Sequence, residues 1–266
     1  MSKISEAIQG VHHLDAMAMQ DKWLNRIHPL AKVLVTLCYI TVLLSFSKYD
    51  LGGIAGMGLY LLILFLTGEI SVKKSLRQVR LVLAVVCAVG IANLFIDRTV
   101  AGHIGIITVT GGMLSMAVLM LKGIFAVLAS YLLIVTTTVE QICYALRLLH
   151  VPKMLVSVFL LIYRYMVVLL KEAERMIQAY ELRAPGQKGI HFRVWGTLAG
   201  QLLLRSIDRA QIVYESMLLR GFDGEFRNHF RNDSYLKSVC YGCACISGIL
   251  FLRMVPIFTV AGSILF

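Results

Sequence analysis

The chain has 266 residues, of which 58% are hydrophobic and only 15% are charged, and its mean hydropathy is +0.78. Soluble domains carry about 25% charged residues, so this composition excludes an ordinary soluble domain and indicates an integral membrane protein. A net charge of +11 would suggest a nucleic-acid partner in a soluble protein. Here the basic residues flank apolar segments, where the positive-inside rule accounts for them. We therefore expect the lipid bilayer, and no nucleic acid, as a partner.

Residues 1–32 are expected to form a cytoplasmic leader, because they are polar, mixed in charge and lack the apolar core of a signal peptide. Pro29 suits the first turn of the helix that follows. The leader contains His12, His13 and Asp15, which could bind a divalent metal. Two adjacent side chains point apart on a helix, however, and no further ligand is evident. A solvated leader, with no metal and no cofactor, is the favoured interpretation.

Four apolar segments predict a transmembrane region over residues 33–137, and they cover residues 33–46, 51–67, 81–96 and 113–136. The second segment is rich in glycine, which lets helices approach closely. Residues 97–112 are expected to form a loop that dips back into the membrane or caps its outer face. Lys122 lies within the fourth segment, where a lysine is costly unless it snorkels or faces a polar cavity. It could instead mark an earlier span boundary.

Charged residues return over residues 138–233, which predict a cytoplasmic segment of amphipathic helices at 139–149, 153–183 and 194–220. The last two of these helices should stop at Ala184-Pro185-Gly186 and at Gly221. Residues 234–266 then predict a C-terminal transmembrane region, with apolar runs at 235–252 and 254–266, the second being short for a full span. The expected fold is an all-α integral membrane protein with about five to six transmembrane helices and a cytoplasmic helical coupling segment.

The apolar run at residues 155–170 could be mistaken for a further span, and charge counting tests this. If this run stays on or near the cytoplasmic surface, the thirteen Lys and Arg residues from Arg147 to Arg231 are inside the cell. Only Lys48, Arg98 and Arg253 are then outside. A span there would move ten of those basic residues outside. The positive-inside rule prefers the first topology, with a cytoplasmic N-terminus, although the rule weakens for long loops.

Two arginines lie where a helical pattern meets glycine or proline, in the motifs Leu182-Arg183-Ala184 and Leu219-Arg220-Gly221. Each guanidinium is expected at a helix C-terminus, where the helix dipole favours a cation by about 0.3–1 kcal/mol. That interaction alone would explain one such arginine. Two similar helix ends in one cytoplasmic segment favour docking on a partner protein, because the rigid guanidinium fork pairs well with carboxylates.

The sequence here resembles the transmembrane T component of energy-coupling factor (ECF) transporters, whose paired Ala-Arg-Gly motifs are similar to Leu219-Arg220-Gly221-Phe222 and to Leu182-Arg183-Ala184. The likeness is closest to the CbiQ type of cobalt and nickel uptake systems. It extends to His28-Pro29-Leu30-Ala31-Lys32 before the first span and to the order of spans and long helices. Neither arginine follows an alanine here, and Ala184 stands where the motif has glycine, so Arg220 is the closer match.

The resemblance implies a coupling and scaffold subunit that links ATP hydrolysis by partner proteins to uptake of a divalent metal, such as the cobalt needed for cobalamin biosynthesis. Its partners would be two ATP-binding cassette ATPase subunits and a substrate-binding membrane S component of CbiM type, with or without a small accessory membrane subunit. It would be a multi-pass protein of the bacterial inner (cytoplasmic) membrane. By resemblance, the ATPase-docking residues are Leu182, Arg183, Ala184, Leu219, Arg220 and Gly221.

Other motifs favour structural interpretations. Cys240-x-x-Cys243-x-Cys245 has metal-ligand spacing but lies in an apolar run with no histidine nearby, so small buried hydrophobic residues are favoured. A stripe of methionines at helical spacing suits soft metals, but packing is the simpler explanation for Met113, Met116 and Met120.

The chain carries no nucleotide-binding, serine-hydrolase or zinc-protease motif, so no catalytic residue is expected and any ATP chemistry must come from another polypeptide. Two alternatives to an importer subunit remain. A self-sufficient carrier or channel would use intramembrane charges, such as Lys122. An intramembrane enzyme acting on lipid-linked substrates would need clustered carboxylates, whereas Glu69 and Asp97 stand apart in the sequence.

Overall fold

The computed structural model describes residues 9–10, 16–19, 23–25, 27–47, 50–68, 75, 84–85, 88, 90, 100–104, 107–187, 189–226 and 235–254. The chain divides into two compact units. We call Ala18–Thr137 with Asn232–Phe266 the bundle unit, and Met1–Met17 with Thr138–Arg231 the α7–α9 unit. Predictions for His12, His13, Asp15, Glu69, Asp97, residues 255–266 and most of the span at 81–96 lie outside the described residues.

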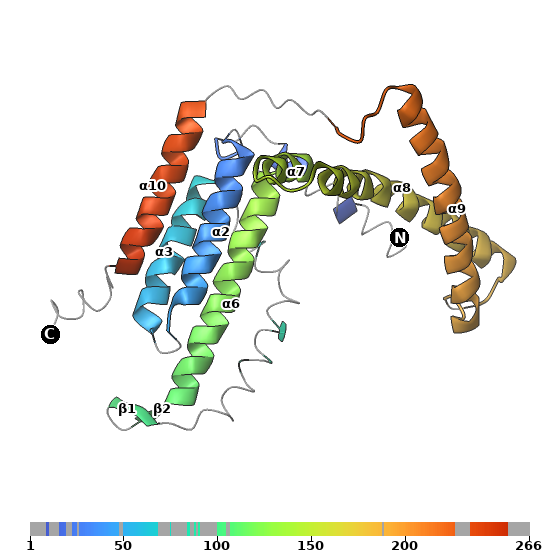
Figure 1. Cartoon of the computed structure of the whole chain (residues 1–266). Helices are drawn as coiled ribbons and strands as arrows, with labels where there is room; N and C mark the ends of the chain where they lie inside the picture. The colour runs from blue at the N-terminus through green and yellow to red at the C-terminus, as the bar shows by residue number, and fades with distance from the viewer. Residues whose placement is uncertain are drawn as a thin grey trace. The chain divides into compact units, whose positions relative to one another are not determined.

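The bundle unit is built from four apolar helices, which Figure 1 shows side by side: α2 (Pro29–Ser45), α3 (Leu51–Thr67), α6 (Gly111–Thr136) and α10 (Tyr235–Met254). Both α6 and α10 pack against α2 and against α3. Large side chains from all four helices are almost wholly buried between them, including Tyr39, Leu43, Ile54, Met57, Phe65, Val118 and Ile249. The protein is thus an all-α membrane protein, as the composition predicted.

Two helix starts follow directly from the sequence. Pro29 is the first residue of α2, as predicted, and the ring Nδ1 of His28 accepts a hydrogen bond from the Leu30 N–H at 3.2 Å. The Asp50 carboxylate caps α3 in the same way, accepting from the Gly53 N–H at 2.9 Å. Such caps satisfy N–H groups that have no acceptor within their own helix.

The predicted close approach of the glycine-rich helix occurs between α3 and α6. A Cβ atom at Gly58 would lie 2.6 Å from Cζ of Phe125, so only glycine leaves room for that ring. A Cβ at Gly56, two residues earlier, would meet nothing within 4 Å. The close contact therefore depends on one position of the glycine run more than on its composition.

Lys122 has a structural explanation within the bundle. Helix α6 runs without a break from Gly111 to Thr136, so Lys122 does not mark a helix boundary. Its Nζ donates to the backbone oxygens of Phe46 at 2.6 Å and Leu44 at 3.3 Å, at the C-terminus of α2. Carbonyl groups at a helix C-terminus lack partners and attract cations.

Arg253 acts on the same helix end. One guanidinium nitrogen donates to the backbone oxygen of Ser45 at 3.3 Å and to its Oγ at 3.1 Å, and the guanidinium carbon lies 4.5 Å from the centre of the Phe46 ring. Two cations from α6 and α10 therefore close the C-terminus of α2.

Lys32 closes the C-terminal end of α6. Its side chain is buried at 6% exposure, and Nζ donates to the backbone oxygen of Thr136 at 2.8 Å and to that of Asn25 at 3.2 Å. Thr136 is the last residue of α6, so this lysine stabilises the position at which the chain leaves the bundle unit.

Part of the expected loop at 97–112 is instead a short antiparallel hairpin of β1 (Val100–Ile104) and β2 (Ile107–Thr110). Its β-branched residues favour strands, and α6 begins directly after β2. By length and composition, Ser115–Thr136 and Lys153–Arg183 can each cross a membrane. Shorter apolar helices cover Pro29–Ser45, Leu51–Thr67 and Ser238–Met254.

The cysteine prediction was partly wrong. Cys240 and Cys243 lie on α10 as expected, but both are exposed rather than buried, because the face of α10 that carries them turns away from α2 and α3. Among the described residues, no group of three or more His, Cys, Asp or Glu side chains could hold a metal ion. Met116 and Met120 lie around Gly90, as the packing interpretation expected.

Candidate functional site

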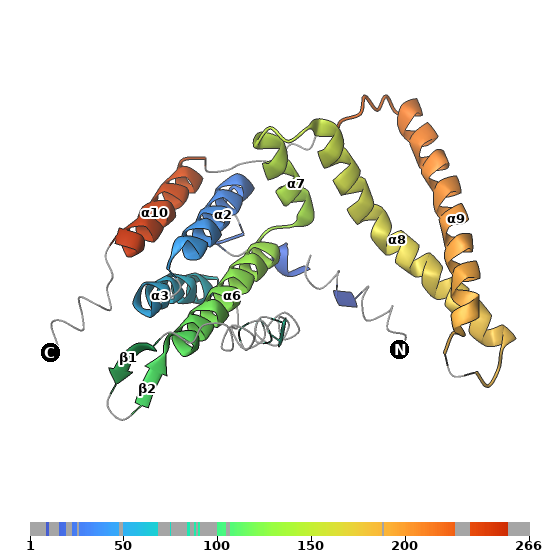
Figure 2. The same ribbon diagram turned by 60° about the horizontal axis from the view of Figure 1, so that its bottom comes forward.

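The candidate site is built on three helices of the α7–α9 unit: α7 (Val139–Leu148), α8 (Lys153–Arg183) and α9 (Phe192–Leu219). A capping box starts α7, since Thr138 Oγ1 accepts from the Gln141 N–H and Gln141 Oε1 accepts from the Thr138 N–H. Pro152 precedes α8, and residues 184–191 connect α8 to α9. Figure 2 shows α8 and α9 as an antiparallel pair.

Arg220 occupies the C-cap of α9 in a Schellman motif. The Gly221 N–H donates to the Leu218 oxygen at 2.9 Å, and the Phe222 N–H donates to the Met217 oxygen at 3.0 Å. Gly221 has a φ of 76°, a left-handed conformation that glycine adopts without steric cost. The Arg-Gly-Phe sequence is therefore a helix stop that sets the direction of the arginine at its end.

Arg183 ends its helix in a different way. It is the last residue of α8, and the C-cap is Ala184, whose N–H donates to the Tyr180 oxygen at 3.1 Å. Ala184 stands where the motif has glycine, and its φ is −124°, so this position does not require a glycine. A left-handed glycine follows only at Gly186, with a φ of 95°. The departure of this motif from Ala-Arg-Gly thus corresponds to a capping geometry that differs from the Schellman motif at Arg220.

Both helix ends present an exposed leucine beside an exposed arginine. Leu182 and Leu219, which precede the two arginines, are 84% and 90% exposed. Within the part of the chain that the structure describes, neither Arg183 nor Arg220 has an ion-pair or hydrogen-bond partner for its guanidinium. Other arginines of the same unit are paired with glutamates: Arg147, Arg164, Arg175 and Arg205.

The two ends are far apart. Helix α9 has 28 residues, and at 1.5 Å per residue it is about 42 Å long. Arg183 is the last residue of α8, next to the connection to α9, whereas Arg220 caps the far end of α9. A single small binding site cannot hold both arginines, so the geometry suits two separate contacts.

The chain beyond Arg220 is fastened to α7 and to the start of α8 by an ion cluster centred on Glu225. The Glu225 carboxylate pairs with Arg147 and with Lys153, whose Nζ lies 2.8 Å from Oε2, and its side chain is 14% exposed. Arg147 also donates to the Phe226 backbone oxygen at 3.3 Å. The hydrogen bond from Lys153, together with nearby Arg147, holds the pKa of Glu225 below its ordinary value although burial opposes this.

Aromatic and polar contacts extend this cluster. The rings of Phe222 and Phe226 lie 5.0 Å apart, and Arg164 lies 6.0 Å from the centre of the Phe226 ring. The Arg164 guanidinium is itself held by Glu140 of α7 through two hydrogen bonds of 2.7 and 3.2 Å. Ser157 Oγ donates to the Gly224 backbone oxygen at 3.0 Å.

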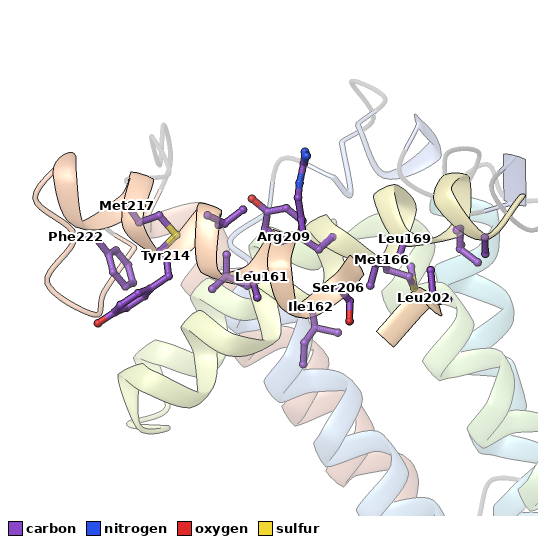
Figure 3. A pocket seen from close by; sticks show the side chains of 15 residues that line it. Leu161, Ile162, Met166, Leu169, Leu202, Ser206, Arg209, Tyr214, Met217 and Phe222 are labelled. Carbon is purple, nitrogen blue, oxygen red and sulfur yellow. The ribbon is translucent and has the colours of Figure 1, made fainter. Parts of the chain in front are cut away.

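An apolar cavity of about 580 Å³ opens between the first half of α8 and the second half of α9. Figure 3 shows Leu161 and Ile162 of α8 facing Tyr214 and Met217 of α9, with Arg209 directed away from the apolar side chains. Phe222, which follows the Schellman turn, closes one end of the cavity. Its size lies in the range of ligand and side-chain pockets.

A second cavity of about 550 Å³ lies between the other halves of the two helices, beside Arg183, Glu172 and Arg205. The Glu172 carboxylate bridges Arg205 of α9 and Arg175 of its own helix. Met176 is the buried residue of α8 that lines this cavity, whereas Ser157 and Leu160 lie near the start of α8 and α9 buries none of its residues.

Sequence reasoning located both arginine ends but missed the cluster at Glu225. The available signal was Arg164, a charge inside the apolar run at residues 155–170, which needs an acidic partner from elsewhere in the chain. A buried or half-buried charge needs a counter-charge. Spacing along the chain does not say which one, since Glu140 is 24 residues before Arg164, and Glu225 is 78 residues after Arg147.

The structure is that of a helical membrane protein whose second unit carries two long helices that end in exposed arginines. The comparison with known families agrees. The chain belongs to the CbiQ family of cobalt transport proteins, whose model matches residues 20–231.

Individual relatives are more distant. The nickel permease LarQ of Lactiplantibacillus plantarum is 29% identical over 118 residues, which are 44% of this chain and 43% of LarQ. The uncharacterized protein MJ1089 of Methanocaldococcus jannaschii is 33% identical over 94 residues, 35% of each chain. The uncharacterized protein MJ1571 of the same organism is 25% identical over 109 residues, 40% of this chain and 37% of that one. The matched segments span less than half the length of each of these relatives.

Proposed function

We propose that this protein is the T component of an ECF-type importer, which couples ATP hydrolysis by two ATP-binding cassette subunits to uptake of a divalent metal, cobalt or nickel, through a partner S component. The observation that carries the proposal is the pair of exposed Leu-Arg helix ends at opposite ends of α8 and α9. The family supplies the class of transport, and the similarity to a nickel permease supports a metal of this size and charge.

The chemistry of the two ends suits docking on acidic clefts. Each guanidinium offers a planar fork of donors that pairs with a carboxylate through two parallel hydrogen bonds. The neighbouring leucine, Leu182 or Leu219, supplies apolar area for the same cleft. Since the ends are about 42 Å apart by helix length, each would occupy its own ATPase subunit. The absence of any nucleotide-binding motif from the sequence makes such docking necessary.

The proposal includes an orientation. We place the protein in the bacterial inner membrane with its N-terminus and the α7–α9 unit at the cytoplasmic side, where ATP is available. The excess of Lys and Arg over residues 138–233 supports this side. A self-sufficient carrier gains no support from Lys122, because that ammonium is engaged at the C-terminus of α2.

Co-purification tests the proposal. The affinity-tagged protein, expressed with the rest of its transporter and extracted in mild detergent, should retain an ATPase at two subunits per chain. Reversing both Arg183 and Arg220 to glutamate should release that ATPase and leave the bundle unit folded. A protein that transports metal in liposomes by itself, without ATP, would establish the carrier function instead.

We further propose that an apolar side chain of the S component fills the cavity between α8 and α9, because its lining is apolar and its size suits a side chain. Replacing Ala210, which lines the cavity, with tryptophan should displace an apolar side chain of the S component and reduce its co-purification several-fold, while the ATPase is retained. The control is Ala199→Trp on the same helix, since Ala199 lines neither of the two cavities described. Equal retention of the S component by both variants would contradict this use of the cavity.

A further inference from the structure

The two arginine ends differ in how firmly the rest of the unit holds them. Four residues link the chain just beyond Arg220 to α7 and to the first turns of α8, by ion pairs and by hydrogen bonds to backbone: Glu225, Arg147, Lys153 and Ser157. These contacts begin only four residues after Arg220. The intervening turn is itself closed by the two hydrogen bonds of the Schellman motif.

The Arg183 end has no comparable attachment among the residues that the structure describes. The hydrogen bonds at residues 184–191 are local: Gln187 N–H donates to Ala184 at 3.3 Å, Tyr180 donates to Gln187 at 2.7 Å, and Val194 N–H donates to His191 at 2.9 Å. The nearest ion pair between the two long helices joins Glu172 of α8 to Arg205 of α9, and it links these helices to each other but not to α7. Regions with few buried contacts open at low free energy, whereas well-packed regions do not.

We propose that Glu225 is a positioning residue that fixes the Arg220 end to α7, so that the two docking ends are mechanically unequal: Arg220 is held rigidly, and Arg183 is carried on the free end of a two-helix arm. This inference rests on the proposed function and deepens it. An ATPase subunit bound at Arg220 would act directly on α7, which follows α6 in the chain. A subunit bound at Arg183 would act through the full length of α8.

The cluster is suited to this role because its parts come from three elements. Arg147 belongs to α7, Lys153 begins α8, and Glu225 follows α9. Removing the carboxylate takes away the acid that pairs with both Arg147 and Lys153. The remaining contacts at this end would be the hydrogen bonds from Ser157 to Gly224 and from Arg147 to Phe226, together with the ring contacts of Phe226.

Photo-crosslinking in the assembled transporter separates the two ends. A photoreactive amino acid replaces Leu219 in one series and Leu182 in the other, since both leucines are exposed. Each is combined with Glu225→Gln, or with the control Glu215→Gln, which removes a carboxylate from exposed α9 surface near the same end. We expect Glu225→Gln to lower the ATPase crosslink at 219 several-fold, to leave the crosslink at 182 unchanged, and the control to affect neither.

The outcomes are distinguishable. An equal loss of the ATPase crosslink at 182 and at 219 would mean a general structural role for Glu225. An unchanged crosslink at 219 would mean that Glu225 has no role there. Either result overturns the inference and leaves the proposed function standing. If the unsubstituted protein gives no ATPase crosslink at either end, the proposed function fails together with it. The double exchange Glu225→Arg with Arg147→Glu restores opposite charges and should recover the crosslink at 219. Failure of that recovery would also count against the inference.

Discussion

Replacing Arg220 with glutamate is expected to abolish metal uptake and to release the ATPase from the detergent-extracted complex. A guanidinium that pairs with a desolvated carboxylate contributes through hydrogen bonds as well as charge. Losing one partner of such a pair typically costs about 2–5 kcal/mol, and reversal adds repulsion. Uptake of radioactive cobalt or nickel by cells, together with the ATPase content of the purified complex, measures both effects.

Two controls distinguish docking from general charge effects. Lys171→Glu makes the same change in net charge on exposed surface of α8, and it should leave uptake near the unsubstituted level. Arg220→Lys keeps the charge but loses the planar fork, so an intermediate loss is expected. The docking role of Arg220 would be refuted by an Arg220→Glu protein that assembles and transports normally.

Valine at Gly221 is expected to impair uptake nearly as strongly as the loss of Arg220. Gly221 has a φ of 76°, and a left-handed conformation costs a residue with a Cβ about 1–2 kcal/mol, with β-branched residues at the high end. The turn would then reopen, the hydrogen bonds from Gly221 and Phe222 to α9 would be lost, and Arg220 would leave its position. Uptake and ATPase co-purification again give the measurement.

Asparagine provides the matched comparison, because it tolerates the left-handed conformation better than other non-glycine residues. Gly221→Asn should keep most of the uptake, whereas Gly221→Val should not. Ala184→Gly at the other arginine end should change little, since Ala184 has a φ of −124° and needs no glycine. Equal activity of the valine and asparagine variants would show that the helix end at Gly221 does not position Arg220.

Most helix boundaries were predictable because they depend on neighbouring residues. The predicted bounds of α3 and α8 match the structure, and those of α2, α9 and α10 differ by no more than four residues at either end. Proline at a helix start and glycine after a helix end act locally, so the sequence displays them. The strands β1 and β2 were predicted only as a loop, because a two-stranded pairing needs a partner segment that apolar content does not identify.

The sequence by itself determined that this is a helical membrane protein, where its long helices end, and that Arg183 and Arg220 stand at those ends. Each of these properties depends on composition or on residues a few positions apart. Only the tertiary structure decided what Lys122 contacts, that α9 carries Arg220 away from Arg183, and that Glu225 pairs with Arg147 and Lys153. Those properties depend on which charges, tens of residues apart, meet when helices pack, and a linear pattern does not contain that pairing.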